Sequence, residues 1–227
     1  MQTQRIPVAS FLAALAIVLG SVSAPAQTSI GLSGYGAFSG TTTANGTQQS
    51  PANQAGGLFE LRHISNPIFG FEGTYSFNRA NQTYTSHPGA CPAFGCSLST
   101  ETVRSNAHEV TADWTPSVHF ANLRPFGVLG VGLLLDVPDN NQATVVTQSP
   151  GAGGSSTTTT STSSTKTSYK PVYVYGAGLD WGLIPHIGVR LQYRGNLYSA
   201  PNVTNLFSST NTFTHTAEPM VGVYVHF

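Results

Sequence analysis

The chain has 227 residues, and its nine lysines and arginines balance nine aspartates and glutamates, so the formal net charge is zero. Charged residues make up 8% of the sequence, against ~25% in ordinary soluble domains. This balance provides no basic surface for nucleic acid, and so few charges cannot cover the exterior of a soluble protein in the usual way. The mean hydropathy is nevertheless close to zero, which argues against a bundle of membrane-spanning helices.

Residues 1–26 have the three parts of a secretory signal peptide. A short basic start precedes a mainly apolar stretch from Val8 to Gly20, and Ala24-Pro25-Ala26 offers small residues for cleavage. The apolar stretch is shorter than the ~20 residues that a spanning helix needs, which disfavours an N-terminal membrane anchor. We therefore expect cleavage after Ala26 and export of residues 27–227 as one domain.

Alternation of apolar and polar residues with a period of two predicts eight β-strands in the exported part. The expected strands are residues 29–38, 57–64, 68–77, 107–114, 124–136, 170–183, 187–198 and 212–227. Their lengths are close to the ~10 residues of a tilted membrane-crossing strand. A chain too uncharged for water and too polar for spanning helices fits a transmembrane barrel of such strands, whose two faces meet different surroundings.

The connections between these strands alternate in length. Long polar segments follow every odd-numbered strand and occupy about residues 39–56, 78–106, 137–169 and 199–211. Tight turns at Ser65-Asn66-Pro67 and around Pro185 follow the second and sixth strands. A transmembrane barrel sorts its connections in this way, because one end has short periplasmic turns and the other has long external loops.

The third long segment contains a stretch of low complexity, Gly151 to Thr167, which is nearly all Gly, Ser and Thr. It has little apolar surface to offset the entropy of ordering, so we expect it to be flexible. A Ser/Thr-rich β extension of the barrel wall is the alternative.

The second long segment contains Cys91 and Cys96, for which an exported chain favours a local disulfide over free thiols or zinc. No cofactor is expected.

Within each strand, one parity is apolar and the other contains the charges. The charged positions have both signs and are Glu60, Arg62, Glu72, Glu109, Asp113, Asp180, Arg190, Arg194 and Glu218. A soluble lipocalin-like barrel is the main alternative, and it would place the apolar parity inside. Its watery exterior would need many lysines, yet the expected strands contain only Lys170 at one margin. We therefore expect the charges to compensate one another in a narrow interior and the apolar parity to face lipid.

Aromatic residues fall near both ends of the expected strands. One group is expected near the periplasmic rim and comprises Phe69, Trp114, Phe126, Trp181 and Phe227. The other is expected near the opposite rim and comprises Tyr75, Phe77, Tyr173 and Tyr198. Two belts of aromatic side chains are favoured by the two interfaces of a bilayer, and ordinary aromatic enrichment in strands is the alternative.

The C-terminal strand has apolar residues at alternate positions, Val221, Val223, Val225 and Phe227. Such a strand closes the barrel against the first strand and leaves no edge. It also resembles the C-terminal signal that the barrel-assembly machinery of the bacterial outer membrane reads. With the segments 124–132 and 188–194, it makes the chain similar to the small outer-membrane β-barrel family, the OmpA/OmpX-type barrel domain. The resemblance implies an all-β, closed, antiparallel, up-and-down barrel in contact with lipid and lipopolysaccharide, and no periplasmic domain is expected after it.

Two residue pairs are candidates for catalysis. Lipid A deacylases use barrels of this size and place a serine two positions after a histidine, as in His63 and Ser65, but this pair runs into the turn expected on the periplasmic side. His215 with Glu218 near one rim is the other acid–base candidate.

An eight-stranded barrel encloses little more than its own side chains, so a pore would be narrow. The sequence thus predicts a structural or surface-interaction protein of the outer membrane, with a lipid-modifying enzyme and a narrow pore as alternatives, and it names no loop partner.

Overall fold

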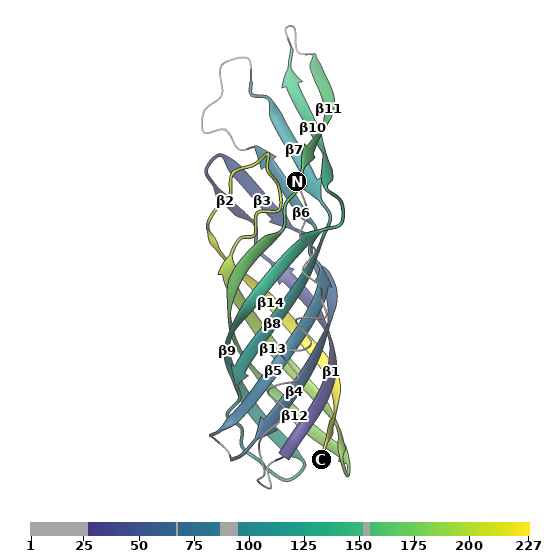
Figure 1. The fold of residues 1–227 in the computed structure, drawn as a ribbon, viewed down its shortest axis with the longest axis vertical. Coiled ribbons are helices and arrows are strands. Elements are labelled where there is room, and N and C mark those ends of the chain that lie inside the picture. The colour runs from purple at the N-terminus through teal and green to yellow at the C-terminus, as the bar shows by residue number, and fades with distance from the viewer. Residues whose placement is uncertain (1–26, 67, 87–94, 152–154) are drawn as a thin grey trace, which may run out of the picture.

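The computed structural model describes residues 27–66, 68–86, 95–151 and 155–227. These residues form two antiparallel β-sheets, one closed into a barrel and one that continues from an end of the barrel (Figure 1). Within the same ranges, no helix has the length and apolar character needed to cross a membrane.

Eight strands close the barrel in the spatial order β1, β14, β13, β12, β9, β8, β5 and β4. In chain order they are β1 (Gln27–Ser39), β4 (Gln54–Ile64), β5 (Gly70–Arg79), β8 (Ser105–Trp114), β9 (Leu123–Pro138), β12 (Ser168–Ile184), β13 (Ile187–Ser199) and β14 (Phe213–His226). They correspond to the eight strands that the alternation predicts, with small differences at the ends. The last strand closes the barrel by pairing with the first, from Ser29 opposite His226 to Ser39 opposite Thr216. The predicted fold class is confirmed.

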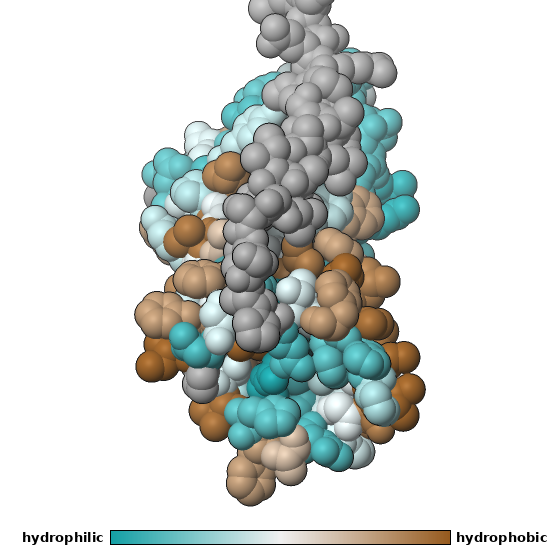
Figure 2. Space-filling view, turned by 60° about the horizontal axis from the view of Figure 1, so that its bottom comes forward, coloured by the Kyte–Doolittle hydropathy of each residue, from teal (hydrophilic) through white to brown (hydrophobic). Residues whose placement is uncertain are grey.

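Polar and charged side chains fill the barrel, and apolar side chains cover its outer wall. Arg62, Arg190 and Arg194 are at most 1% exposed, whereas Leu191 and Val223 are 55% and 56% exposed. Figure 2, which brings the end with the short turns forward, shows apolar side chains along the sides of the barrel and polar ones at this end. The lipocalin-like alternative is therefore wrong, because it requires the opposite arrangement.

A second sheet of six strands lies beyond the end of the barrel where the long connections begin (Figure 1). We call it the extension sheet. Its strands in spatial order are β11 (Ser156–Ser164), β10 (Gln142–Pro150), β7 (Leu98–Val103), β6 (Gln82–Ser86), β3 (Thr47–Pro51) and β2 (Thr42–Ala44). The first three long connections thus each contribute one hairpin. The β2–β3 hairpin turns at Asn45 and Gly46, whose φ values of 52° and 69° suit a type I′ turn.

The flexibility expected for the low-complexity stretch is wrong over Ser156–Ser164. This segment is strand β11, which pairs with Gln142–Pro150 along its whole length. Threonine has a β-branched side chain that favours extended backbone, so a segment without an apolar face still forms a strand when a partner strand is present.

Seven of the nine aromatic residues predicted for the two belts are exposed on the outer wall, among them Phe69, Trp114 and Trp181. The prediction is wrong for Phe126 and Tyr198. Phe126 is buried in the barrel, where the guanidinium carbon of Arg62 lies 3.9 Å from the centre of its ring. This cation–π contact stabilises an aromatic ring in a charged interior. The hydroxyl of Tyr198 is also inside, 2.7 Å from the hydroxyl of Thr216.

Leu191→Arg is expected to lower the free energy of unfolding by about 2–4 kcal/mol, because an arginine on the lipid face near the bilayer midplane is poorly solvated. The matched control Thr144→Arg lies on the exposed face of the extension sheet and should change it by less than about 0.5 kcal/mol. Urea titration of the protein refolded in lipid vesicles, followed by tryptophan fluorescence, measures both. Equal losses would contradict the assignment of the outer wall to lipid.

Candidate functional site

Five charged side chains meet across the barrel in what we call the lower ion layer: Glu60, Arg62, Glu72, Asp180 and Arg190. Nη2 of Arg62 lies 2.5 Å from Oε2 of Glu72, and its Nη1 lies 3.1 Å from Oδ2 of Asp180. Arg190 donates to Glu60 and, from Nε, to Asp180 at 2.6 Å. These contacts join β4 and β5 to β12 and β13 on the opposite side of the barrel. The layer therefore fills the lumen.

The strand register explains why these charges meet. Arg62 is the direct partner of Glu72 in the β4–β5 ladder, and Asp180 is the direct partner of Arg190 in the β12–β13 ladder. Directly opposed side chains on one face of an antiparallel pair are close enough to interact. Two ladders on opposite walls thus each supply one pair of opposite charges, and Arg62 and Arg190 reach across the barrel to link them.

Arg194 organises a second group, the upper ion layer, which also contains Glu109 and Asp113. Its Nη2 donates to Oε1 of Glu109 at 2.9 Å, and its Nη1 lies 3.8 Å from Oδ2 of Asp113. Thr74 and Thr111 accept further hydrogen bonds from the same guanidinium at 3.0 and 2.9 Å. Taking ions out of water is costly, so a buried guanidinium is stable only with several such partners.

Two further carboxyl groups, those of Asp136 and Glu218, are buried beside the upper ion layer, and Glu218 is the direct partner of Arg194 in the β13–β14 ladder. Neither forms an ion pair with any of the described residues, and Oδ2 of Asp136 and Oε2 of Glu218 have no hydrogen-bond partner there. They line a cavity of about 40 Å³ together with Tyr198, which has room for bridging water. Glu218, a predicted member of the charge network, is therefore inside the barrel but outside the ion pairs. Asp136 was missed, because it ends the predicted strand.

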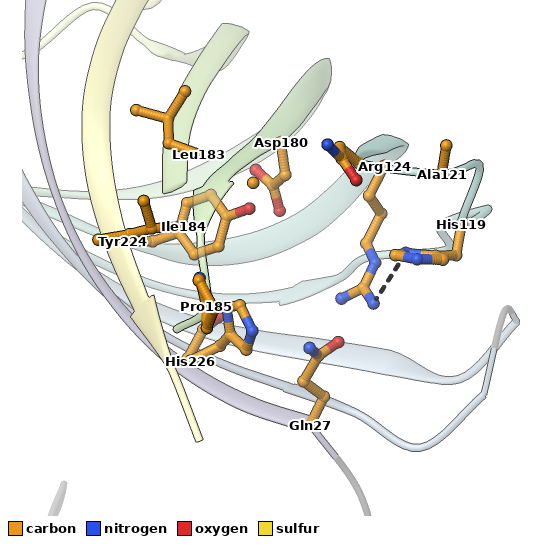
Figure 3. Close-up of a pocket in the computed structure, with 13 residues that line it drawn as sticks. Gln27, His119, Ala121, Arg124, Asp180, Leu183, Ile184, Pro185, Tyr224 and His226 are labelled. Atoms are coloured by element: carbon orange, nitrogen blue, oxygen red, sulfur yellow. Dashed lines mark hydrogen bonds between the residues drawn. The ribbon is translucent and has the colours of Figure 1, made fainter. Parts of the chain in front are cut away.

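A larger cavity, of about 410 Å³, lies at the end with the short turns (Figure 3). Arg124 and His119 line one side of it, with Nη2 and Nδ1 3.4 Å apart, and Tyr224 and His226 of β14 line another. Asp180 of the lower ion layer is also part of the lining. The cavity thus reaches inward to the lower ion layer, whose side chains fill the lumen at that level. This filling disfavours the narrow pore.

The inner face of the extension sheet has a small apolar core of its own. Tyr84, Val103 and Ala143 pack there against Val203 and Phe207 of the fourth long connection, residues 200–212. The Tyr84 hydroxyl donates to the carbonyl of Pro201 and accepts from the amide of Val203, both at 3.1 Å. Burial raises the pKa of Tyr84 above its ordinary value, so the hydroxyl remains protonated and available as a donor.

A buried carboxylate attaches the same connection to the sheet. Glu101 is fully buried, and its Oε2 accepts a hydrogen bond of 2.6 Å from the Thr204 hydroxyl, while its Oε1 accepts one from Ser163. The fourth connection is thus held by apolar and polar contacts at once. Sequence reasoning missed this core because its apolar residues are isolated in polar segments.

Phe207→Ala is expected to release the fourth connection and leave the barrel intact. Removing a buried phenylalanine ring costs about 3–5 kcal/mol, which is enough to open a small surface segment locally. Hydrogen exchange at the amides of Val203 and Asn205 should therefore become faster, while exchange in the barrel strands should not change. The control Leu206→Ala removes an exposed side chain and should leave these rates unaltered. If these two amides exchanged as fast in the unmodified protein as in Phe207→Ala, the fourth connection would not be anchored.

Most side chains on the outer face of the extension sheet bear a hydroxyl group. Two rows run across five strands: Thr162, Thr144, Thr102, Thr83 and Ser50 form one, and Thr160, Val146, Thr100, Thr85 and Gln48 form the next. Neighbouring hydroxyl groups in these rows form hydrogen bonds, Thr83 with Thr102 at 3.3 Å and Thr85 with Thr100 at 3.5 Å. Both rows are uncharged, so this face offers hydrogen bonds rather than ionic contacts.

The two candidate catalytic pairs have structural positions. Nδ1 of His63 lies 3.1 Å from the Thr28 hydroxyl, and the amide of Ser65 donates to the carbonyl of Phe69 within the short turn. Glu218 faces the barrel interior, whereas Nε2 of His215 lies 2.8 Å from the Tyr175 hydroxyl on the outer wall. The proposed pairing of His215 with Glu218 is wrong, because alternate faces of β14 separate them.

The remaining predicted residues lie at the barrel seam or outside the described ranges. Val221, Val223, Val225 and Phe227 are exposed on the outer wall, and the Phe227 amide donates to the Thr28 carbonyl at 3.0 Å. Their role as an assembly signal stays a prediction. Cys91 and residues 1–26 lie outside the described residues, so the Cys91–Cys96 disulfide and the signal peptide stay predictions too.

Several solved outer-membrane proteins are similar to this chain. They include Ail, the attachment invasion locus protein of Yersinia pestis, with 15% identity over 89% of this chain and 99% of that chain and a TM-score of 0.45. Neisserial surface protein A has 13% identity over 91% of this chain and all of its own, with a TM-score of 0.45. OprG of Pseudomonas aeruginosa has 10% identity over 88% and 95%, with a TM-score of 0.49. No curated protein matches the sequence.

One family model matches almost the entire chain. It describes the outer membrane protein β-barrel domain, and the match covers residues 12–223. These residues include seven complete barrel strands and most of β14. This chain belongs to the outer membrane protein β-barrel domain family, and its place is the outer membrane.

Proposed function

We propose that this chain is a non-catalytic outer-membrane protein that presents its extension sheet outside the cell as a rigid binding surface. In barrels of this class, short turns face the periplasm and long connections face the exterior. The extension sheet is built from the long connections, so it belongs on the external side. Export through residues 1–26, insertion by the barrel-assembly machinery, and contact of the outer wall with lipid and lipopolysaccharide are parts of the same proposal.

The observation that carries this proposal is the order of the external part. The described parts of all four long connections are tied together, three as paired hairpins and the fourth through Tyr84, Glu101 and Phe207. A surface that is already ordered loses less conformational entropy when it binds a partner than mobile loops do. Binding residues are also commonly placed on connections that a stable scaffold supports.

The experiment compares bacteria that produce the complete protein with bacteria that produce a barrel in which two-residue turns replace all four external connections. Heat-modifiable migration in gels confirms that both barrels are folded. Cells are then tested for attachment to arrays of immobilised glycans, extracellular-matrix proteins and other cells. We expect attachment with the complete protein and its loss with the shortened one. Equal attachment by both strains would contradict the proposal.

The two alternatives have less support. The His63 and Ser65 pair is at the end with the short turns, far from externally located lipid A, and the ion layers fill the lumen through which a pore would run. Mass analysis of lipid A and conductance across planar bilayers test them directly. We expect unchanged lipid A and no steady conductance.

A further inference from the structure

Strand β11 forms one edge of the extension sheet and pairs on one side with β10. Its nine residues, Ser156–Ser164, are all serine or threonine. Natural proteins protect exposed edges with lysine, proline, bulges or a covering segment, because unpaired backbone groups bind further strands. Strand β11 contains no charge and no proline, so its sequence offers no such protection.

The pairing with β10 shows which backbone groups face the open edge. Pro150 lacks an N–H group and stands opposite Ser156, while the flanking amides of Gly151 and Thr165 donate to the carbonyls of Ser155 and Asn141. Hydrogen-bonded and non-bonded pairs alternate in an antiparallel ladder. The odd-numbered residues of β11 therefore bond to β10. The even-numbered residues direct their N–H and C=O groups away from β10, and these are Ser156, Thr158, Thr160, Thr162 and Ser164.

The fourth connection already occupies the base of this edge. The amide of Asn205 donates to the Ser164 carbonyl at 3.1 Å, the amide of Lys166 donates to the Val203 carbonyl at 2.9 Å, and Thr204 forms an antiparallel bridge with Thr165. The connection then turns inward to bury Phe207. The edge thus accepts an antiparallel strand, and the pairing stops below the segment from Ser156 to Thr162.

We propose that this segment binds the same segment of a second copy of the chain, as an antiparallel strand that joins two extension sheets. The inference rests on the proposed function of the sheet as an external binding surface. Pairing Ser156 with Thr162, and Thr158 with Thr160, uses all four outward-facing residues of this segment in both copies and places Thr159 opposite its own counterpart; the fifth outward-facing residue, Ser164, already accepts from the Asn205 amide. A twofold contact of this kind is closed and self-complementary.

The side chains favour a second copy over an unrelated peptide. Eight of the nine positions of β11 are exposed, Ser163 is half-buried, and all nine bear a hydroxyl, so the edge has no apolar pocket or charge that would select a different side chain. An identical strand meets it with threonine opposite threonine or serine, a pairing that forms hydrogen bonds and brings no like charges together. Threonine also has a high preference for strands.

The direction of the strands determines where the second copy lies. Strand β11 extends away from the barrel, roughly along the long axis of the molecule (Figure 1). Antiparallel pairing requires a twofold axis perpendicular to the strands, and this rotation points the second barrel in the opposite direction. Copies in one membrane have parallel β11 strands. The proposed contact therefore joins two apposed membranes, as in adhesion between cells.

Vesicle association tests the proposal with the complete protein. Two populations of phosphatidylcholine vesicles contain the protein, with a donor dye in one and an acceptor dye in the other. We expect energy transfer between populations for the unmodified protein and for Thr160→Val, which keeps the backbone N–H. Thr160→Pro removes that donor without touching the β10 ladder, as an edge strand tolerates, and should reduce transfer to the level of protein-free vesicles.

Gel migration and unchanged hydrogen exchange at β10 amides confirm that both variants are folded. Energy transfer with Thr160→Pro as high as with the unmodified protein would overturn the proposal. So would a lack of association by the unmodified protein. That second result leaves the proposed function standing, because attachment to glycans and matrix proteins is measured separately.

Cross-linking tests the register. In a Cys91→Ser, Cys96→Ser background, Thr159→Cys places two thiols in a non-hydrogen-bonded pair, where the Cα atoms of opposed residues are about 4.5 Å apart, a distance that a disulfide spans. Thr160→Cys faces Thr158 of the other copy instead. After mixing of two differently tagged vesicle populations, we expect mixed dimers for Thr159→Cys and few for Thr160→Cys. Equal yields, or dimers only within one population, would overturn the proposal.

Discussion

Arg190→Met is expected to lower the free energy of unfolding by about 3–5 kcal/mol, because it leaves buried carboxylates without their cation. Arg190 donates to Glu60 and Asp180, and all three side chains are almost fully buried. Methionine fills a similar volume, so the loss arises from charge rather than from a cavity. Urea titration in lipid vesicles measures the change, and a loss below about 1 kcal/mol would show that the lower ion layer does not hold the barrel together.

The control for this variant is the double variant that combines Arg190→Met with Glu60→Met. Within the described residues, Glu60 forms one ion pair, and its partner is Arg190. Arg190→Met alone therefore leaves the Glu60 carboxylate buried and unpaired, and the added Glu60→Met removes that carboxylate. Replacing both members of a buried pair by apolar groups is often neutral, and the double variant should therefore recover part of the loss. An additive loss would contradict direct pairing of the two residues.

Gly132→Ala is expected to lower the free energy of unfolding by about 1–3 kcal/mol, and to slow refolding into vesicles, because the barrel wall has no room for a side chain there. A Cβ atom at Gly132 would overlap the backbone oxygen of Val110 and lie 2.9 Å from Cα of Thr111. Both obstacles are backbone atoms of the neighbouring strand, so a rotamer change cannot remove them.

Gly73 provides a matched control, since a Cβ there meets no atom within 4 Å. Gly73→Ala should change the free energy of unfolding by less than about 1 kcal/mol, in the stabilising direction, because alanine reduces the freedom of the unfolded chain. The same urea titration measures both variants. If both variants lost a similar free energy of unfolding, the loss would come from replacing any glycine in a strand and not from the close contact at Gly132.

The barrel could be predicted from the sequence because lipid imposes a strict alternation of apolar and polar residues on every strand that crosses it. Val189, Leu191 and Tyr193 must be apolar, while Arg190 and Arg194 must find partners inside. The register of the ion pairs was beyond sequence reasoning, since Arg62 and Asp180 are 118 residues apart and meet only when opposite walls close. Phe126 was misplaced for a related reason, because its interior position depends on the arginine that stacks on it.

The extension sheet shows where alternation gives no information. Its outer face meets water and its inner face is covered by residues 200–212, which contain few apolar side chains, so neither parity of β10 or β11 stands out as apolar. The available signals were the strand preference of threonine and the Asn45-Gly46 turn, which marks a tight hairpin.

Labelling of single cysteines on intact bacteria tests the central claim most directly. Thr102→Cys lies on the outer face of the extension sheet, and His119→Cys lies in the connection at the opposite end; both positions are exposed. In a Cys91→Ser, Cys96→Ser background, a maleimide that does not cross membranes should label Thr102→Cys on intact cells. It should label His119→Cys only after the outer membrane is opened. Labelling of His119→Cys on intact cells, with Thr102→Cys protected, would contradict the proposed orientation and the external binding surface.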